Sequence, residues 1–172
     1  MQKRTKFLLG AIVAVFLALT SVPLAFAAGG EGGNGNGDVR FLQLTTRTLQ
    51  EANVDAPPDG DSVGDRFVFS DTVFREGKEV GTDGGECVLV QFKPGSDHEA
   101  PEAVIGQCFA TVSLPEGQIT AQGLIDFASD GPATLAVTGG TGEFHNARGE
   151  VEVKDESATE SRLLFHLFLN HH

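Results

Sequence analysis

The sequence contains no tryptophan and no tyrosine, and its aromatic residues are thirteen phenylalanines. A core built from phenylalanine has no phenol or indole group that could donate a hydrogen bond. Histidine, cysteine and carboxylate residues do not occur at the spacing of a metal site, and no serine or cysteine lies in a known nucleophile motif. We therefore expect no metal, no cofactor and no nucleophilic hydrolase.

Basic residues are the next shortage. The chain has 12 lysines and arginines against 24 aspartates and glutamates, which gives a formal net charge of −12. A protein this acidic repels phosphate groups, so we exclude nucleic acid and anionic lipid as partners.

Long apolar runs are confined to the N-terminus. Lys3, Arg4 and Lys6 precede an apolar stretch, and Ala25-Phe26-Ala27 then places small residues where a signal peptidase reads them. An uncleaved membrane anchor is the alternative, but the run is short for a span of about 20 residues. We predict a signal peptide over residues 1–27 and a secreted protein, whose loss of three positive charges leaves a net charge of −15.

Residues 28–37 are mostly glycine and contain nothing apolar to bury, so we interpret them as a flexible tether. The remaining residues, 38–172, suffice for one domain. Within it, eight short segments rich in Val, Ile, Phe and Thr alternate with turn sequences, a spacing typical of a sandwich or barrel. The segments are Val39–Thr48, Arg66–Phe74, Glu86–Phe92, Gln107–Leu114, Gln118–Phe127, Ala133–Thr138, Ala147–Lys154 and Arg162–Leu169.

Eight antiparallel strands can close into a barrel, which leaves no open sheet edge. We therefore predict an all-β fold, an eight-stranded antiparallel β-barrel, with room inside for packed side chains or one small ligand. Cys87 and Cys108 fall in the third and fourth segments and can face each other across a hairpin. In an exported protein a disulfide between them is the default, and a reactive thiol pair is the alternative.

One glycine-rich stretch imitates a nucleotide site. Leu135 to Gly142 reads Leu-Ala-Val-Thr-Gly-Gly-Thr-Gly, like a strand that enters a dinucleotide-binding loop. Such a loop needs a following helix to hold the pyrophosphate, and the next residues show no helical period. We interpret the glycines as a tight connection between strands.

The same stretch resembles a family signature. Residues Thr134–Val151 resemble the glycine-centred motif shared by allene oxide cyclases and dirigent proteins. Gly64–Phe74 resembles the second strand of both families, Gly84–Val90 the third strand of the cyclases, and Gly117–Gly123 a strand beside their lipid pocket. The resemblance implies an eight-stranded barrel that holds a hydrophobic guest, in agreement with the strand count.

The resemblance also implies candidate site residues. Asp71 and Arg148 match an acidic residue and an arginine with which dirigent proteins orient a reactive guest. The first-strand acid of both families is replaced by Thr46, and the tyrosine of the cyclases is absent, so genuine allene oxide cyclase activity is not expected. By alternation, Arg148 lies on the face of Glu150 and Glu152, which also permits an outward salt bridge. The expected ligand contacts are Phe67, Phe69, Leu44, Thr46 and Val137.

These features give one main hypothesis and two alternatives. The main one is a secreted barrel that binds a small hydrophobic, oxygenated molecule and steers its cyclisation or coupling, as an isomerase-like enzyme. The alternatives are a carrier without turnover and a barrel filled by its own side chains that meets other proteins. The segment Leu163–Leu169 is apolar on both faces except at His166, which favours a homo-oligomer, a dimer or trimer.

Overall fold

The computed structural model describes residues 37–96 and 100–170. The predicted signal peptide and all but the last residue of the predicted tether lie outside these ranges. The described residues include no helix that has the length and apolar character to cross a membrane.

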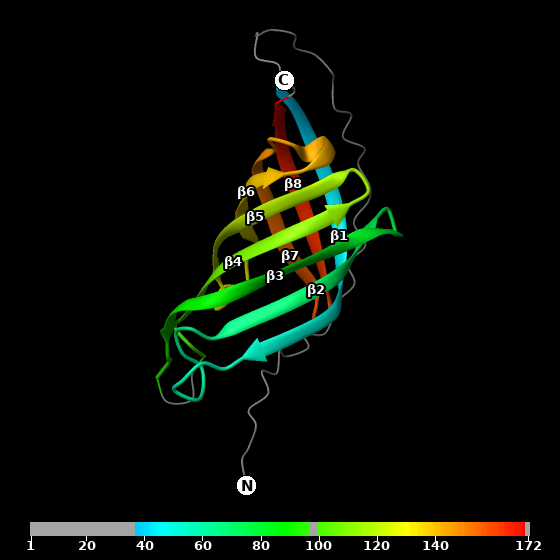
Figure 1. Ribbon diagram of the computed structural model, residues 1–172. Coiled ribbons are helices and arrows are strands. Elements are labelled where there is room, and N and C mark those ends of the chain that lie inside the picture. Colours follow the sequence, from blue (N-terminus) through cyan, green and yellow to red (C-terminus); the bar gives the residue numbers. More distant parts are fainter. Residues whose placement is uncertain (1–36, 97–99, 171–172) are drawn as a thin grey trace, which may run out of the picture. The chain divides into compact units, whose positions relative to one another are not determined.

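Eight strands form one closed antiparallel barrel in which each strand pairs with its neighbours in sequence, and β1 pairs with β8 to complete the ring. Figure 1 shows the first strand (cyan) beside the last one (red). The fold class predicted from the sequence is confirmed. The strands are β1 Gly37–Val54, β2 Arg66–Arg75, β3 Lys78–Lys93, β4 Ala103–Leu114, β5 Gly117–Asp126, β6 Ala133–Gly140, β7 Arg148–Ser157 and β8 Glu160–Asn170.

Alternation along the strands places one face of each strand inside the barrel. The inward aliphatic residues of all strands but β3 form a single core cluster, to which Leu44, Val73, Ile119 and Leu167 contribute side chains that are at most 1 % exposed. The short 3₁₀ turn η1 (Gly142–Phe144) contributes Phe144, which is fully buried, to the same cluster. The glycine-rich stretch is therefore followed by a single turn and strand β7, without the helix that a dinucleotide site requires.

Strand β3 differs most from the sequence prediction, because it starts at Lys78 rather than at Glu86. The early part contains glycines, which normally weaken a strand. Here they allow the backbones to approach each other closely. A Cβ atom on Gly81 would lie 2.0 Å from the carbonyl oxygen of Ser113, and one on Gly85 would lie 2.2 Å from that of Phe109. The glycines thus mark close contacts within the sheet rather than a loop.

The outer face of β1 and β8 is apolar, as the sequence pattern indicated. Phe41 is 76 % exposed and stacks on His166, with ring centroids 4.6 Å apart, and Phe168 packs against the same His166 ring with centroids 4.8 Å apart. The register places Val39 opposite Phe168 on the same face. The homo-oligomer expected from this pattern stays a prediction.

Candidate functional site

Two aspartates face each other inside the barrel. Asp71 on β2 lies directly opposite Asp83 on β3, and a hydrogen bond joins their carboxyl groups. The inward direction of this pair follows from its neighbours, since Val73 two residues along β2 is fully buried and Val112, opposite Asp83 on β4, is 4 % exposed. Asp83 itself is 8 % exposed, so this carboxyl group is almost entirely removed from water.

Thr46 on β1 completes the group from the other side of Asp71. Its side chain is 3 % exposed, and its hydroxyl donates a hydrogen bond to the Asp71 carboxylate. The family resemblance implies an acidic residue on the first strand, and this chain has Thr46 at that position. The structure supplies a second carboxylate from β3 instead.

Burial changes the protonation of both aspartates. Burial, with the negative charge and the hydrogen bond of Asp71 acting in the same direction, raises the pKa of Asp83 from 3.8 to about 8. Burial also raises the pKa of Asp71, helped by the charge of Glu51 and opposed by the hydrogen bonds from Asp83 and Thr46. Two carboxyl groups that lie directly opposite each other in a buried site do not both ionise, because the two negative charges would repel each other. At neutral pH the pair therefore holds one proton, mainly on Asp83, and one negative charge.

Phenylalanines and the disulfide line the barrel next to the pair. Phe67 and Phe69 share the inward face of β2 and stack on each other with ring centroids 5.7 Å apart. Both are half-buried, in contrast to the fully buried Val73, so solvent reaches this part of the inward face of β2. The predicted disulfide between Cys87 and Cys108 is present and links β3 to β4 opposite Phe67.

The absent side chain at Gly85 makes room for one of these rings. Gly85 lies opposite Phe69, and a Cβ atom there would come within 3.0 Å of the Phe69 ring. The ring therefore rests against bare backbone of β3.

The remaining predicted contacts fall into two groups. Thr46, Phe67 and Phe69 surround Asp71, as described. Leu44 and Val137, at 1 % and 3 % exposed, are members of the packed core cluster and do not lie on the accessible side. We therefore leave these two residues out of the candidate site.

Arg148 is not brought to Asp71. It is exposed on the outer face of β7, opposite Phe168, and its guanidinium donates hydrogen bonds to the carbonyl oxygens of Thr138 (3.0 Å) and Ala147 (2.7 Å). Arg148 thus points outward, which is the alternative that the alternation along this strand also permitted. Arg148 holds the end of β6 against β7, and we leave it out of the candidate site.

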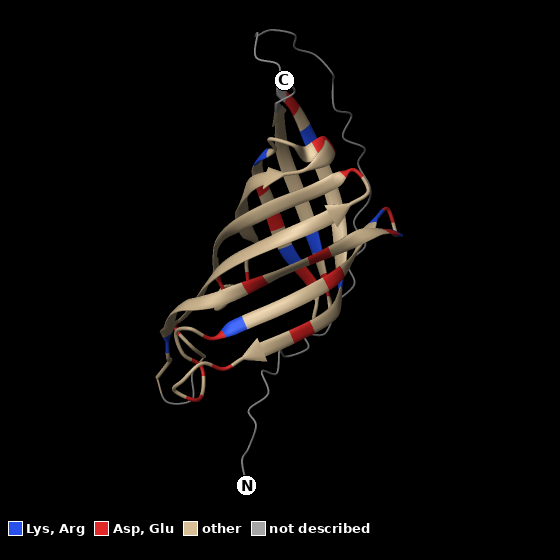
Figure 2. Cartoon of the chain, viewed as in Figure 1, with Lys and Arg blue, Asp and Glu red and all other residues tan. Residues whose placement is uncertain are grey.

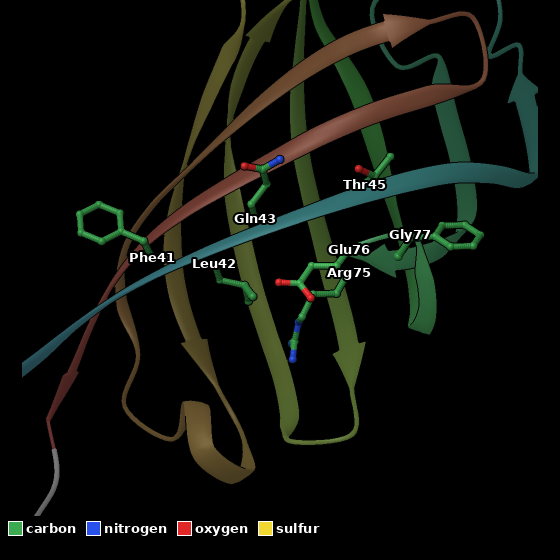
Figure 3. A pocket seen from close by; sticks show the side chains of 8 residues that line it. Phe41, Leu42, Gln43, Thr45, Arg75, Glu76 and Gly77 are labelled. Atoms are coloured by element: carbon green, nitrogen blue, oxygen red, sulfur yellow. The ribbon is translucent and has the colours of Figure 1, made fainter. Parts of the chain in front are cut away.

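A separate pocket of about 420 Å³ lies where β1 passes the turn between β2 and β3. Figure 3 shows side chains of β1 and of this turn around it, among them Leu42 and Arg75. Arg75 is engaged in an ion pair with Glu116 at 2.6 Å, which lowers the pKa of Glu116. This pocket contains no pair of titratable groups like the one inside the barrel, so it is not our candidate site.

Asp83 is the site residue that sequence reasoning missed. Counting back from the turn at Glu76-Gly77 would set Asp71 opposite Thr82, but an irregularity between Val73 and Phe74 shifts the register by one residue. A bulge of this kind leaves no clear mark in a sequence. A hairpin alignment that tested both registers would have found the aspartate pair.

Residues 45–166 match the family described as the allene oxide cyclase barrel-like domain. The chain belongs to this family. A search of curated protein sequences gives no match.

Solved structures of similar proteins agree with this assignment. A pyocyanin demethylase is 33 % identical over 74 % of this chain and 99 % of its own, with a TM-score of 0.63. The Diels Alderase AbmU from Streptomyces koyangensis is 16 % identical over 80 % of this chain and 71 % of its own, with a TM-score of 0.58. A pterocarpan synthase dirigent protein is 18 % identical over 78 % of this chain and 96 % of its own, with a TM-score of 0.57. At the last two identities the likeness concerns the fold alone.

Proposed function

We propose that this member of the allene oxide cyclase barrel-like family binds a small hydrophobic, oxygenated molecule inside the barrel and steers its rearrangement, cyclisation or coupling. The observation that carries the proposal is the buried Asp71–Asp83 pair beside the half-buried phenylalanines. An aliphatic barrel gains nothing in stability from a carboxyl group buried there, because burial of such a group costs free energy. Selection for a chemical role accounts for its presence.

The pair is suited to proton transfer at neutral pH. Asp83 holds a proton and lies next to an Asp71 carboxylate, so one group can donate a proton to a guest oxygen while the other accepts one. A carboxyl group whose pKa is near the working pH is most effective in this role. Thr46 fixes the orientation of the Asp71 carboxylate through its hydrogen bond. Confinement of the guest against Phe67 and Phe69 adds the orientation that a ring closure or coupling needs.

The relative with 33 % identity is named for the demethylation of pyocyanin, so pyocyanin is the first substrate to test on this chain. The other named relatives are a Diels Alderase and a dirigent protein. Fatty-acid epoxides and phenols complete the panel, because both classes present an oxygen that the pair can protonate.

We also propose that the protein is exported and processed after Ala27. The cross-strand disulfide supports this proposal, because disulfides persist in oxidising compartments. Edman sequencing of the protein recovered from culture medium is the test, and the expected N-terminus is Ala28-Gly29-Gly30. Recovery of the intact N-terminus from the membrane fraction instead would favour the uncleaved anchor.

Native mass spectrometry of the purified protein, followed by organic extraction, is the first test of the guest. We expect a co-purifying small molecule, and in the panel a product whose rate of formation falls about 10²–10⁴-fold in Asp71→Asn. Asp130→Asn, in an exposed loop, is the matched control with unchanged activity. Binding without turnover would favour a carrier. If the protein binds nothing in the panel and purifies empty, the proposal is wrong.

A further inference from the structure

The charge inside the barrel points to the kind of guest. This inference rests on the proposed interior site and concerns its selectivity. The charged residues that the strand register turns toward the interior near Asp71 are all acidic. Glu51 lies opposite the inward Phe69, and Asp155 lies opposite Ser161, which in turn lies opposite the buried Thr46. Figure 2 shows acidic residues on each of β1, β2 and β3.

The nearby arginines do not offset this charge. Successive residues of a strand face opposite sides, and each of these arginines is next to an inward-facing residue, so each one points outward. Each also forms an ion pair with a glutamate, at N–O distances of 3.2, 3.9 and 3.3 Å. The arginines are Arg47, Arg66 and Arg162. None of these three arginines is therefore placed to pair with a guest carboxylate beside Asp71.

One atom of the pair also lacks a partner. Asp83 is only 8 % exposed. Its Oδ1 atom is buried and makes no hydrogen bond. An unsatisfied buried oxygen of this kind destabilises the folded protein. A guest that brings positive charge or a polarised hydrogen to this atom would offset this effect.

The aromatic wall favours the same class of guest. The faces of phenylalanine rings carry partial negative charge and attract cations that are shielded from water. Phe67 and Phe69 are stacked at 5.7 Å with an interplanar angle of 21°, and both lie on the face of β2 that also carries Asp71. Flat aromatic guests pack well on such a surface.

We infer that the interior site selects aromatic molecules that carry positive charge, such as N-alkylated heteroaromatic rings, and rejects carboxylates. Aspartate oxygens on one side and phenylalanine faces on the other then hold the cation. The fatty-acid epoxides of the substrate panel carry a free carboxylate, so the same charges should make them its weakest binders.

Three probes of nearly equal size test this inference without knowledge of the natural guest. They are the N-methylquinolinium cation, neutral quinoline and quinoline-4-carboxylate, and their dissociation constants are measured by isothermal titration calorimetry at pH 7.5. For the unmodified protein we expect the cation to bind at least tenfold more tightly than quinoline, and the carboxylate not to bind measurably. Raising the salt concentration should weaken binding of the cation only modestly, because buried charges are screened little.

Variants locate the origin of the preference. In Asp71→Asn/Asp83→Asn both carboxyl groups are replaced by amides of the same shape, and the preference for the cation should fall to within about threefold of quinoline. Glu51→Gln, at an exposed position, provides a second readout if the double variant does not fold, with a smaller loss of preference. Glu150→Gln, on the outer face, is the control and should leave the preference unchanged.

The outcomes separate this inference from the proposed function. Equal binding of cation and quinoline, or measurable binding of the carboxylate, would overturn the charge selectivity and leave the interior site intact. A preference that survives in the double variant would place the cation elsewhere and overturn the inference. Failure of all three probes, together with an empty purified protein, would overturn both this inference and the proposed function.

Discussion

Thr46 on β1 and Asp83 on β3 flank Asp71 from its two neighbouring strands, and these two are the buried polar residues within residues 37–96 and 100–170. Their effects on the central carboxyl group differ. The Thr46 hydroxyl only donates to Asp71 and so favours the ionised form, whereas Asp83 shares a proton with it. Removing either flanking group should therefore change the titration of the site in a distinct way.

The first prediction concerns stability and pH. Folding raises the pKa of Asp83 from 3.8 to about 8, so between these values the folded protein holds a proton that the unfolded chain releases. Stability is then lost as the pH rises through this window. Asparagine resembles the protonated carboxyl group, so Asp83→Asn should be the more stable form by on the order of 2 kcal/mol at pH 8.5, with a smaller difference at pH 5.

Urea denaturation of both proteins at pH 5, 7 and 8.5 measures this effect. The exposed Asp130→Asn variant serves as control and should follow the unmodified protein at every pH. Parallel stability curves for Asp83→Asn and the unmodified protein would show that Asp83 titrates normally.

The second prediction concerns Thr46. Thr46→Val keeps the shape of the side chain but removes the hydroxyl that lowers the pKa of Asp71. Loss of this hydrogen bond removes a contact that favours the ionised form, so the pKa of Asp71 should rise further. Carbon-13 NMR titration of the aspartate carboxyl carbons checks this, with Thr45→Val as the control from the opposite face of β1. An unchanged or lower Asp71 pKa in Thr46→Val would contradict the assigned hydrogen bond.

The third prediction concerns the disulfide. Cys87 and Cys108 are 21 residues apart, so their bond restricts the unfolded chain. Replacing both by alanine should lower the free energy of unfolding by about 3 kcal/mol. Guanidinium denaturation with and without a reductant is the measurement. Reduced unmodified protein should match the double variant, and the reductant should leave that variant unchanged. A reductant effect on the variant would point to another cause.

The fourth prediction uses two adjacent glycines. A Cβ atom on Gly140 would lie 2.4 Å from the carbonyl oxygen of Gln118 and 2.8 Å from the Phe144 Cβ atom, whereas one on Gly139 would meet nothing closer than 3.7 Å. Gly140→Ala should therefore destabilise the fold by about 2 kcal/mol or more, and Gly139→Ala by less than about 1 kcal/mol. Thermal unfolding followed by circular dichroism measures both. Equal effects would mean that this turn does not pack as described.

The sequence predicted the number of strands, their order and the disulfide, because alternating apolar residues and turn residues are local signals. It also placed Asp71 on the same face of its strand as Phe67 and Phe69, but it did not tell whether that face turns inward. It could not give Asp83, because that residue lies in a glycine-rich stretch typical of a turn and its register depends on a one-residue irregularity. Leu44 and Val137 were predicted as ligand contacts, but they lie in the packed core cluster. The sequence does not show how deep an inward residue lies, because that depth is set by the stagger of all eight strands.

The seam between β1 and β8 affects how the protein is made. Because the strand that completes the wall is the last one in sequence, the enclosed interior does not exist until β8 has been synthesised and has found β1 across more than a hundred residues. Joining such distant segments is slow compared with forming hairpins. A guest therefore cannot assist the early steps of folding, and any chain that ends before β8 exposes the edges of β1 and β7. Such truncated chains should aggregate rather than retain partial binding.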